Sequence, residues 1–268
     1  MQIGSPASPA FSAGAPVLES FGFKFSAGGA HISRTMMLGE LGAVLAAVPI
    51  GSSSAAYRAA ILQRNVLGKT TASTRRKSFR HLRELYALDE AVPIFSLLRK
   101  LHSADHGTSL PLLALQVAWS RDPLLRATTP PVLDAAVGDR LERASLVRAF
   151  EAVFPDQYSP ATLKTTTQNA ASSWTQAGYL KGRLNKVRQK LRPTAVAVTM
   201  ALFLGQLAGY HGAAVFSSPW VRLLDLGADR ARAMAQEAHR AGLLNLRAVG
   251  EVVELSFPML DRFRGTSA

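Results

Sequence analysis

The side chains of this sequence that could do chemistry are mostly guanidinium and ammonium groups, and many of them lie in two stretches that lack acids. Between Gly51 and Arg83 the chain has eight Arg or Lys and no Asp or Glu. Such groups bind phosphates and the edge of guanine. Because exposed helix faces usually mix charge signs, this first basic cluster predicts contact with nucleic acid, with an ordinary solvated face as the alternative. Its members are Arg58, Arg64, Lys69, Arg75, Arg76, Lys77, Arg80 and Arg83.

The second basic cluster lies between Gln157 and Leu224, where the chain again has no acid. It combines basic residues with short polar side chains that could donate or accept hydrogen bonds at base edges. The alternative is a polar exposed helix beside an edge strand whose charges only prevent strand pairing. The polar face carries Lys164, Thr165, Gln168, Asn169, Ser172 and Gln176, and the basic residues that follow are Lys181, Arg183, Lys186, Arg188, Lys190 and Arg192.

Both clusters are expected to contact duplex DNA, mainly through phosphate and with modest sequence preference. With roughly six to ten phosphates neutralised, binding should weaken steeply with salt. The candidate contact residues are Arg64, Lys69, Arg75, Arg76, Lys77, Arg80, Arg83, Lys164, Gln168, Asn169, Lys181, Arg183, Lys186, Arg188, Lys190 and Arg192.

The charge of the whole chain favours a polyanionic partner. Its 31 Lys and Arg against 18 Asp and Glu give a formal net charge of +13 over 268 residues. The self-repulsion of this excess would be relieved by nucleic acid, by an anionic membrane surface or by an acidic protein. A basic composition without any such partner is the remaining alternative.

Several kinds of chemistry are excluded or disfavoured. The sequence has no cysteine, which excludes disulfides, thiolate metal ligands and cysteine nucleophiles and fits a cytoplasmic protein. His102 and His106 have helical spacing but no third ligand nearby, and no Ser–His–acid pattern has a recognisable local context. We therefore expect no metal, no cofactor and no enzymatic activity.

Helices are expected to position the first cluster. Apolar periodicity and capping residues predict helices over 36–48, 52–65 and 70–85, and the last two form a helix-turn-helix outline. On the third helix Arg76, Arg80 and Arg83 share one stripe. Beside them an apolar stripe can dock on the preceding helix. That stripe is Phe79, Leu82 and Tyr86.

The second cluster lies in a winged-helix outline. A helix ends near Phe154, Ser159 and Pro160 start another, and after Gly178 the residues from 186 to 192 alternate between charged and other side chains, which predicts a strand with one charged face. The expected buried face of the 160–177 helix is Leu163, Thr167, Ala170, Trp174 and Ala177.

The remaining elements are also mostly helical. Helices are expected over 92–102, 110–119 and 131–154, the last broken near Gly138, and a 228–241 helix precedes a hairpin that turns at Gly250–Glu251. Residues 193–221 carry no charged side chain, but Gln206, His211 and several glycines interrupt them, so we expect a buried core helix and no membrane span.

The expected fold is mainly α, in two domains. Residues 1–20 are rich in Ser, Ala, Pro and Gly, have no signal-peptide pattern and predict a flexible tail. Residues 21–130 would form a helical domain with the helix-turn-helix-like unit. Residues 131–268 would form a winged-helix-like C-terminal domain with small β-hairpins.

Four stretches in order resemble the BrxA family, small accessory proteins of the BREX phage-defence systems of bacteria, once described as inner-membrane proteins. The resemblance covers most of the chain from about residue 30, and none of its motifs is catalytic. The stretches are 60–85, 112–125 (LLALQVAWSRDPLL), 158–182 (YSPATLKTTTQNAASSWTQAGYLKG) and 223–253.

The resemblance implies a double-stranded DNA-binding accessory protein with no catalytic activity of its own, acting beside other defence-system proteins. The same family has been likened to NusB-type antitermination proteins, which bind RNA. RNA therefore stays an alternative partner, and a basic protein-interaction scaffold stays another.

Overall fold

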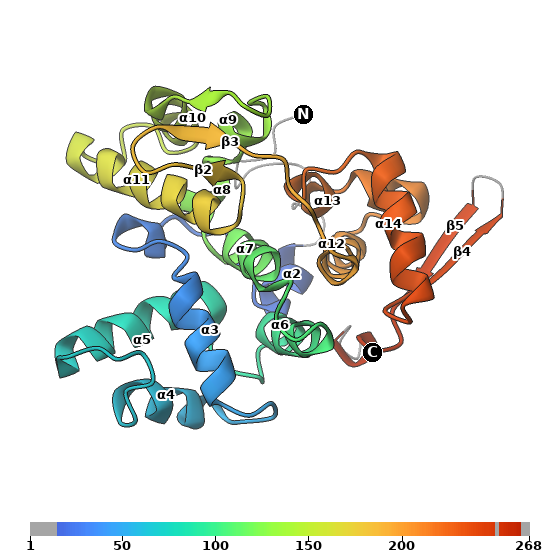
Figure 1. Ribbon diagram of the computed structural model, residues 1–268, viewed down its shortest axis with the longest axis horizontal. Helices are drawn as coiled ribbons and strands as arrows, with labels where there is room; N and C mark the ends of the chain where they lie inside the picture. The colour runs from blue at the N-terminus through green and yellow to red at the C-terminus, as the bar shows by residue number, and fades with distance from the viewer. Residues whose placement is uncertain (1–14, 250–251, 264–268) are drawn as a thin grey trace.

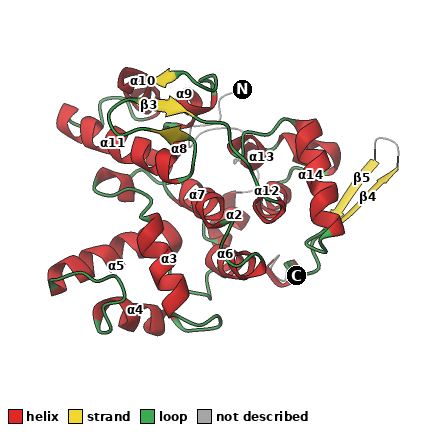
Figure 2. Cartoon of the chain, in the orientation of Figure 1, coloured by secondary structure: helices red, strands yellow, loops and turns green. Residues whose placement is uncertain are grey.

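The helix α7 (Leu110–Arg121) lies at the centre of the fold, and the other elements surround it (Figure 1). The computed structural model describes residues 15–249 and 252–263. Within them the chain forms thirteen α-helices and two small antiparallel sheets (Figure 2). Every residue of α7 from Leu112 to Arg121 is buried, and helices from all parts of the chain contact it. The expectation of a mainly α fold with small hairpins is confirmed.

The N-terminal helices come close to the predicted ranges. They are α3 (Leu38–Ala47), α4 (Ser54–Leu62), α5 (Ala72–Tyr86) and α6 (Pro93–Ala104). Before them lie α2 (Ala15–Phe21) and a 3-10 turn, η1 (Ala30–Ile32). The prediction of a flexible tail through residue 20 was wrong for α2, because Leu18 and Phe21 are buried in the core; residues 1–14 lie outside the described residues.

The middle of the chain forms a helical unit with a three-stranded sheet. Its elements are α8 (Pro123–Ala127), α9 (Thr129–Leu133), β1 (Arg140–Leu141), α10 (Arg143–Val153), α11 (Pro160–Gln176), β2 (Leu180–Lys181) and β3 (Lys186–Arg188). The strands are antiparallel in the order β1-β3-β2.

This unit differs from the sequence predictions in two places. The break predicted near Gly138 is confirmed, since φ there is +96° and the chain turns; the strand β1, which follows the break and pairs with β3, was not predicted. The expected strand over 186–192 is short and ends at Arg188.

The C-terminal part packs on the other side of α7. Its elements are α12 (Ala195–Leu207), η2 (Gly212–Ser217), α13 (Pro219–Leu223), α14 (Ala228–Arg240), β4 (Asn245–Val249), β5 (Val252–Ser256) and η3 (Asp261–Phe263). The predicted 228–241 helix and the following hairpin are present, although the residues of the turn lie outside the described part.

The uncharged segment forms the core helix that the sequence predicted, since α12 is buried from Val196 to Gly205. Among the described helices, none is by itself long and apolar enough to cross a bilayer; α12 and the segment Gly212–Leu223 meet the criteria only as a pair, bent by 119°.

One hydrophobic core runs through both predicted domains. The cluster extends from Leu18 to Phe263 and includes Trp119, Trp174 and Trp220. A second, smaller cluster lies beneath α10 and α11, where the rings of Phe150, Phe154 and Tyr158 pack on one another. These two clusters fix α11 relative to the rest of the fold.

Candidate nucleic-acid interface

The orientation of α11 follows from its sequence. Ser159 caps the helix by accepting a hydrogen bond from the Thr162 amide at 3.3 Å, and Pro160 occupies the first helical position. The inner face is buried as predicted, at Leu163, Thr167, Ala170, Trp174 and Ala177. The outer face therefore presents polar side chains to solvent. Lys164, Thr165 and Gln168 are exposed, and Ser172 is half-buried.

Two residues predicted for the outer face hold the fold together instead. The Asn169 amide donates to the His31 carbonyl at 2.9 Å. The Gln176 side chain accepts from the Leu38 amide at 3.1 Å and donates to Thr35 at 3.0 Å. Both side chains are half-buried against the 31–38 segment, where their hydrogen bonds hold that segment to α11.

A buried hydrogen-bond chain ties the same segment to α11 and to the start of α8. His31 Nδ1 lies 2.7 Å from Asp122 Oδ2, and His31 Nε2 lies 2.8 Å from Ser173 Oγ. Ser173 Oγ also accepts from the Met36 amide at 2.8 Å. No sequence pattern predicts this set of hydrogen bonds, because its members are far apart along the chain.

These three residue types also form the catalytic triad of serine hydrolases, which makes their surroundings decisive. The exposed fractions of His31 and Ser173 are 0%, and that of Asp122 is 1%. None of the three lines a described pocket. Burial raises the pKa of Asp122, but His31 and the amide donors of Leu125 and His31 outweigh it, so the net pKa is lowered. The arrangement fastens the fold and offers no hydroxyl to a substrate.

The β2–β3 hairpin extends from the end of α11. Gly182 has φ of +104°, and a Cβ there would collide with the Asn185 carbonyl, so the tight turn requires glycine. Lys181, Arg183 and Leu184 are exposed at this turn. Lys186 donates to Thr175 of α11 at 2.9 Å, and burial lowers the pKa of its ammonium group.

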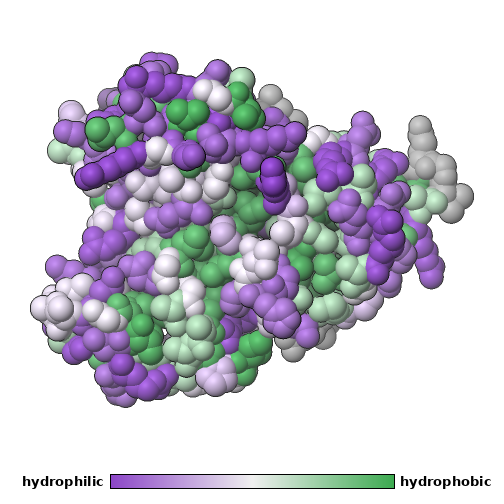
Figure 3. All heavy atoms as spheres, in the orientation of Figure 1, coloured by the Kyte–Doolittle hydropathy of each residue, from purple (hydrophilic) through white to green (hydrophobic). Residues whose placement is uncertain are grey.

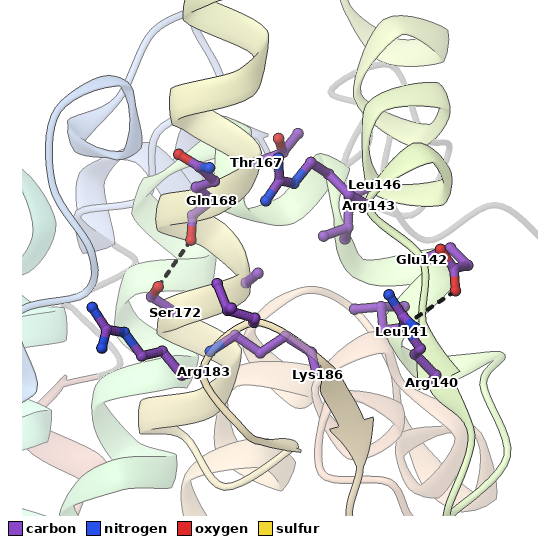
Figure 4. A pocket seen from close by; sticks show the side chains of 12 residues that line it. Arg140, Leu141, Glu142, Arg143, Leu146, Thr167, Gln168, Ser172, Arg183 and Lys186 are labelled. Atoms are coloured by element: carbon purple, nitrogen blue, oxygen red, sulfur yellow. Dashed lines mark hydrogen bonds and ion pairs between the residues drawn. The ribbon is translucent and has the colours of Figure 1, made fainter.

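The hairpin, α11 and the start of α10 enclose a pocket of about 500 Å³ (Figure 4). Arg143, Arg183 and Lys186 surround it, and Gln168 and Ser172 line its α11 side. Arg140 also lines it and pairs with Glu142 at 3.4 Å, the one carboxylate among the lining residues. Arg140 and Arg143 were not among the predicted site residues. Glu142 lies between them, and both precede the acid-free stretch that marked the second basic cluster. We call Lys164, Gln168, Ser172, Arg183 and Lys186, with Arg140 and Arg143, the α11–hairpin surface.

Arg188 does not lie on this surface. Its side chain is 1% exposed, pairs with Asp225 at 2.7 Å and donates to the Val132 carbonyl at 3.0 Å. The guanidinium also lies over the Tyr179 ring, 4.7 Å from the centroid. The expected exposed charge at Arg188 is therefore wrong, whereas Lys190 and Arg192, just beyond β3, are exposed.

The helix α5 carries the other basic surface. Thr71 caps it by accepting from the Thr74 amide at 3.1 Å, and Leu82, Leu85 and Tyr86 anchor its inner side. Phe79 is half-buried, with the Arg83 guanidinium 5.8 Å from its ring centroid. We call the following residues the α5 surface: Arg75, which is half-buried, and Arg76, Lys77, Arg80 and Arg83, which are exposed.

The turn before α5 is less positive than the sequence predicted. Arg64 is exposed, but Lys69 pairs with Glu40 of α3 at 3.0 Å. Arg34 is a further cation near this turn and was not among the predicted site residues. Burial lowers the pKa of His81, and the charges of Arg80 and Arg34 lower it further. Arg34 thus lies near the α5 surface although it precedes α3.

The two surfaces flank the same N-terminal segment, since both α5 and α11 contact η1. In Figure 3 hydrophilic side chains gather at the upper left, around the three-stranded sheet, and lie among near-neutral and apolar side chains toward α11 and α5. Among the described residues, no group of three or more His, Asp or Glu could hold a metal ion.

No protein-family model matches the chain, and no curated protein matches it.

Proposed function

We propose that the protein binds duplex DNA through the α11–hairpin surface and the α5 surface, without catalysing a reaction. The observation that carries the proposal is the meeting of the polar outer face of α11 with a basic hairpin at one positively lined pocket. Side chains such as Gln168 can hydrogen-bond to base edges, while Arg and Lys neutralise phosphates. The two kinds of contact that duplex recognition needs are thus available on adjacent elements.

The connectivity supports a finer proposal, that residues 123–188 are a winged-helix-like unit. Helices α8 and α9, strand β1, helices α10 and α11, and strands β2 and β3 follow one another, with β3 between its partners. In that arrangement α11 would enter the major groove, and the β2–β3 hairpin would be the wing. The helices α4 and α5 would act as a second helix-turn-helix-like element on the phosphates.

The setting of the proposal rests on the resemblance to the BrxA family. We infer a cytoplasmic accessory role in phage defence, beside other proteins of the system. RNA is the second candidate partner, favoured by the same basic surfaces, because phosphate contacts do not by themselves distinguish the two nucleic acids.

The test is a fluorescence-anisotropy titration of a labelled duplex at several salt concentrations, with RNA and single-stranded competitors. The proposal expects duplex binding that falls steeply with salt and resists RNA competition. Preferential competition by RNA would establish the alternative partner. If no nucleic acid binds at low salt, the proposal fails, and acidic protein partners become the class to test.

A further inference from the structure

The β2–β3 hairpin presents a large apolar side chain at its tip, among basic neighbours. Leu184 is 86% exposed, the highest exposure among the large apolar side chains of the described residues. It lies between Arg183 and Asn185 on a turn that Gly182 keeps tight. While it stays exposed, Leu184 contributes little to the stability of the fold, so a partner that covered this side chain would gain the free energy of its burial.

The neighbours of Leu184 indicate the chemistry of what would cover it. Lys181 and Arg183 precede it, Lys186 follows, and the nearest acid among the pocket residues is Glu142, which already pairs with Arg140. A second copy of this hairpin is a poor partner for Leu184, because its basic side chains would repel those beside the leucine. A polyanion with an apolar interior satisfies both the cations and the leucine, and a stack of base pairs is such a polyanion.

We propose that Leu184 is a wedge that inserts between two stacked base pairs from the minor groove and bends the DNA. This inference rests on the proposed function, because it requires that the protein binds duplex DNA. The narrow hairpin can enter a groove that excludes a helix. Apolar side chains that enter in this way unstack a base step and kink the duplex by about 20–90°. Arg183 would contact the phosphates or the groove floor beside the wedge, while α11 holds the neighbouring turn of the duplex.

The experiment uses a duplex that contains several TpA steps, which unstack most easily, with 2-aminopurine at the adenines and a donor–acceptor dye pair at the ends. The full chain is compared with Leu184→Ala. The wild type should raise 2-aminopurine emission at least twofold and shorten the end-to-end distance. The variant should bind within about threefold of the wild type but lose both signals, because phosphate contacts supply most of the affinity.

Val252→Ala is the matched control, because Val252 is 73% exposed at the other hairpin and should leave both signals unchanged. Thermal unfolding checks that neither variant alters the fold. If Leu184→Ala retains the emission rise and the bend, or if the wild type binds DNA without either signal, the wedge is wrong while DNA binding stands. If the wild type binds no DNA, the proposed function fails as well. A parallel sedimentation assay with anionic vesicles tests lipid as the partner. If Leu184→Ala reduces association with the vesicles but leaves both DNA signals unchanged, the leucine contacts lipid and the wedge proposal is overturned.

Discussion

The α5 surface and the α11–hairpin surface have similar charge but different mixtures of side chains and different partners within the fold. The α5 surface is a stripe of cations on a helix whose inner side packs against α4 and α7, and its Arg80 and Arg83 border a pocket of about 430 Å³ that also holds Glu84 and Asp89. The α11–hairpin surface is hollowed into a pocket and mixes cations with amide and hydroxyl groups. Charge alone suits binding that is independent of sequence, whereas directed donors and acceptors in a concave site suit discrimination. Under the proposed function, we therefore expect the first surface to supply most of the affinity for DNA and the second most of the sequence selectivity.

The two surfaces also differ in how they are held. The inner side of α5 is fixed by apolar packing, while α11 is fixed in addition by the buried chain of Asp122, His31 and Ser173. Such a chain of buried hydrogen bonds holds a helix in one position. Its contribution to stability depends on every member, because removing one leaves the others buried without a partner.

The largest effect is expected from breaking that chain. Asp122→Ala removes the partner of His31 and the cap that accepts from the Leu124 and Leu125 amides. Removing one partner of a buried pair costs about 3–5 kcal/mol of unfolding free energy. Urea unfolding measures the loss. The exposed Asp134→Ala is the control and should change stability by no more than about 0.5 kcal/mol. A loss at Asp122 as small as at Asp134 would contradict the role of the chain.

The same carboxylate gives a pH dependence of known sign. Because the folded pKa of Asp122 is lowered, its contribution is present above the unfolded pKa of about 3.9 and is lost as the pH falls through the folded value. The stability advantage of the wild type over Asp122→Asn should therefore shrink below about pH 4. An advantage that instead grew on acidification would contradict this sign.

The next largest effect separates the two surfaces directly. The triple variant Arg76→Ala, Arg80→Ala, Arg83→Ala should weaken binding about 100-fold at physiological salt on every duplex and reduce the salt slope by about three. The reason is that exposed cations on one stripe act on phosphates and carry no sequence information. Anisotropy titrations at several salt concentrations measure both quantities.

A charge-matched control tests whether location or net charge matters. Arg222, Arg230 and Arg240 are exposed in the C-terminal part of the chain, and replacing all three with Ala removes the same charge elsewhere. The control should weaken binding far less. Equal losses in the two triple variants would mean that only the overall charge acts.

Local patterns predicted much of the fold and the outline of both surfaces. The face of α11 that is buried was read from helical period alone, and α5 and α12 follow from capping residues and apolar content. These features could be predicted because they depend only on residues a few positions apart along the chain.

Long-range packing was what the sequence could not reveal. Asn169 and Gln176 have the composition of an exposed polar face, yet a segment about 138 residues earlier covers them. Arg188 continues an alternating charged pattern, yet its side chain is buried and pairs with Asp225, which lies on a later loop. In each case a polar side chain is wholly or partly covered because a distant partner satisfies it, and nothing in the adjacent residues marks that partner.

A smaller and more selective effect should come from the outer face of α11. Gln168→Ala should reduce affinity about tenfold or more for a preferred site while leaving other duplexes within about twofold, since an amide contributes mainly at a base edge. Selection of bound sequences from a random pool, followed by titration, measures this. Thr165→Ala is the control: its hydroxyl donates to the Ala161 carbonyl at 3.0 Å and lies outside the pocket. Uniform weakening on all sequences by Gln168→Ala would place this helix on phosphates and remove the contrast between the surfaces.

The smallest effect concerns how far the α5 surface extends. Lys69 precedes α5 but is paired with Glu40 at 3.0 Å, and both side chains are 30% exposed. Glu40→Gln should free the ammonium group, raise duplex affinity about two- to threefold and steepen the salt slope by no more than about one. Stability should change by less than about 1 kcal/mol, because partly exposed pairs contribute little. Lys69→Ala should then weaken binding more in the Glu40→Gln background than in the wild type. Equal effects of Lys69→Ala in both backgrounds would mean that Lys69 does not contact the duplex, so that the α5 surface begins at the helix itself.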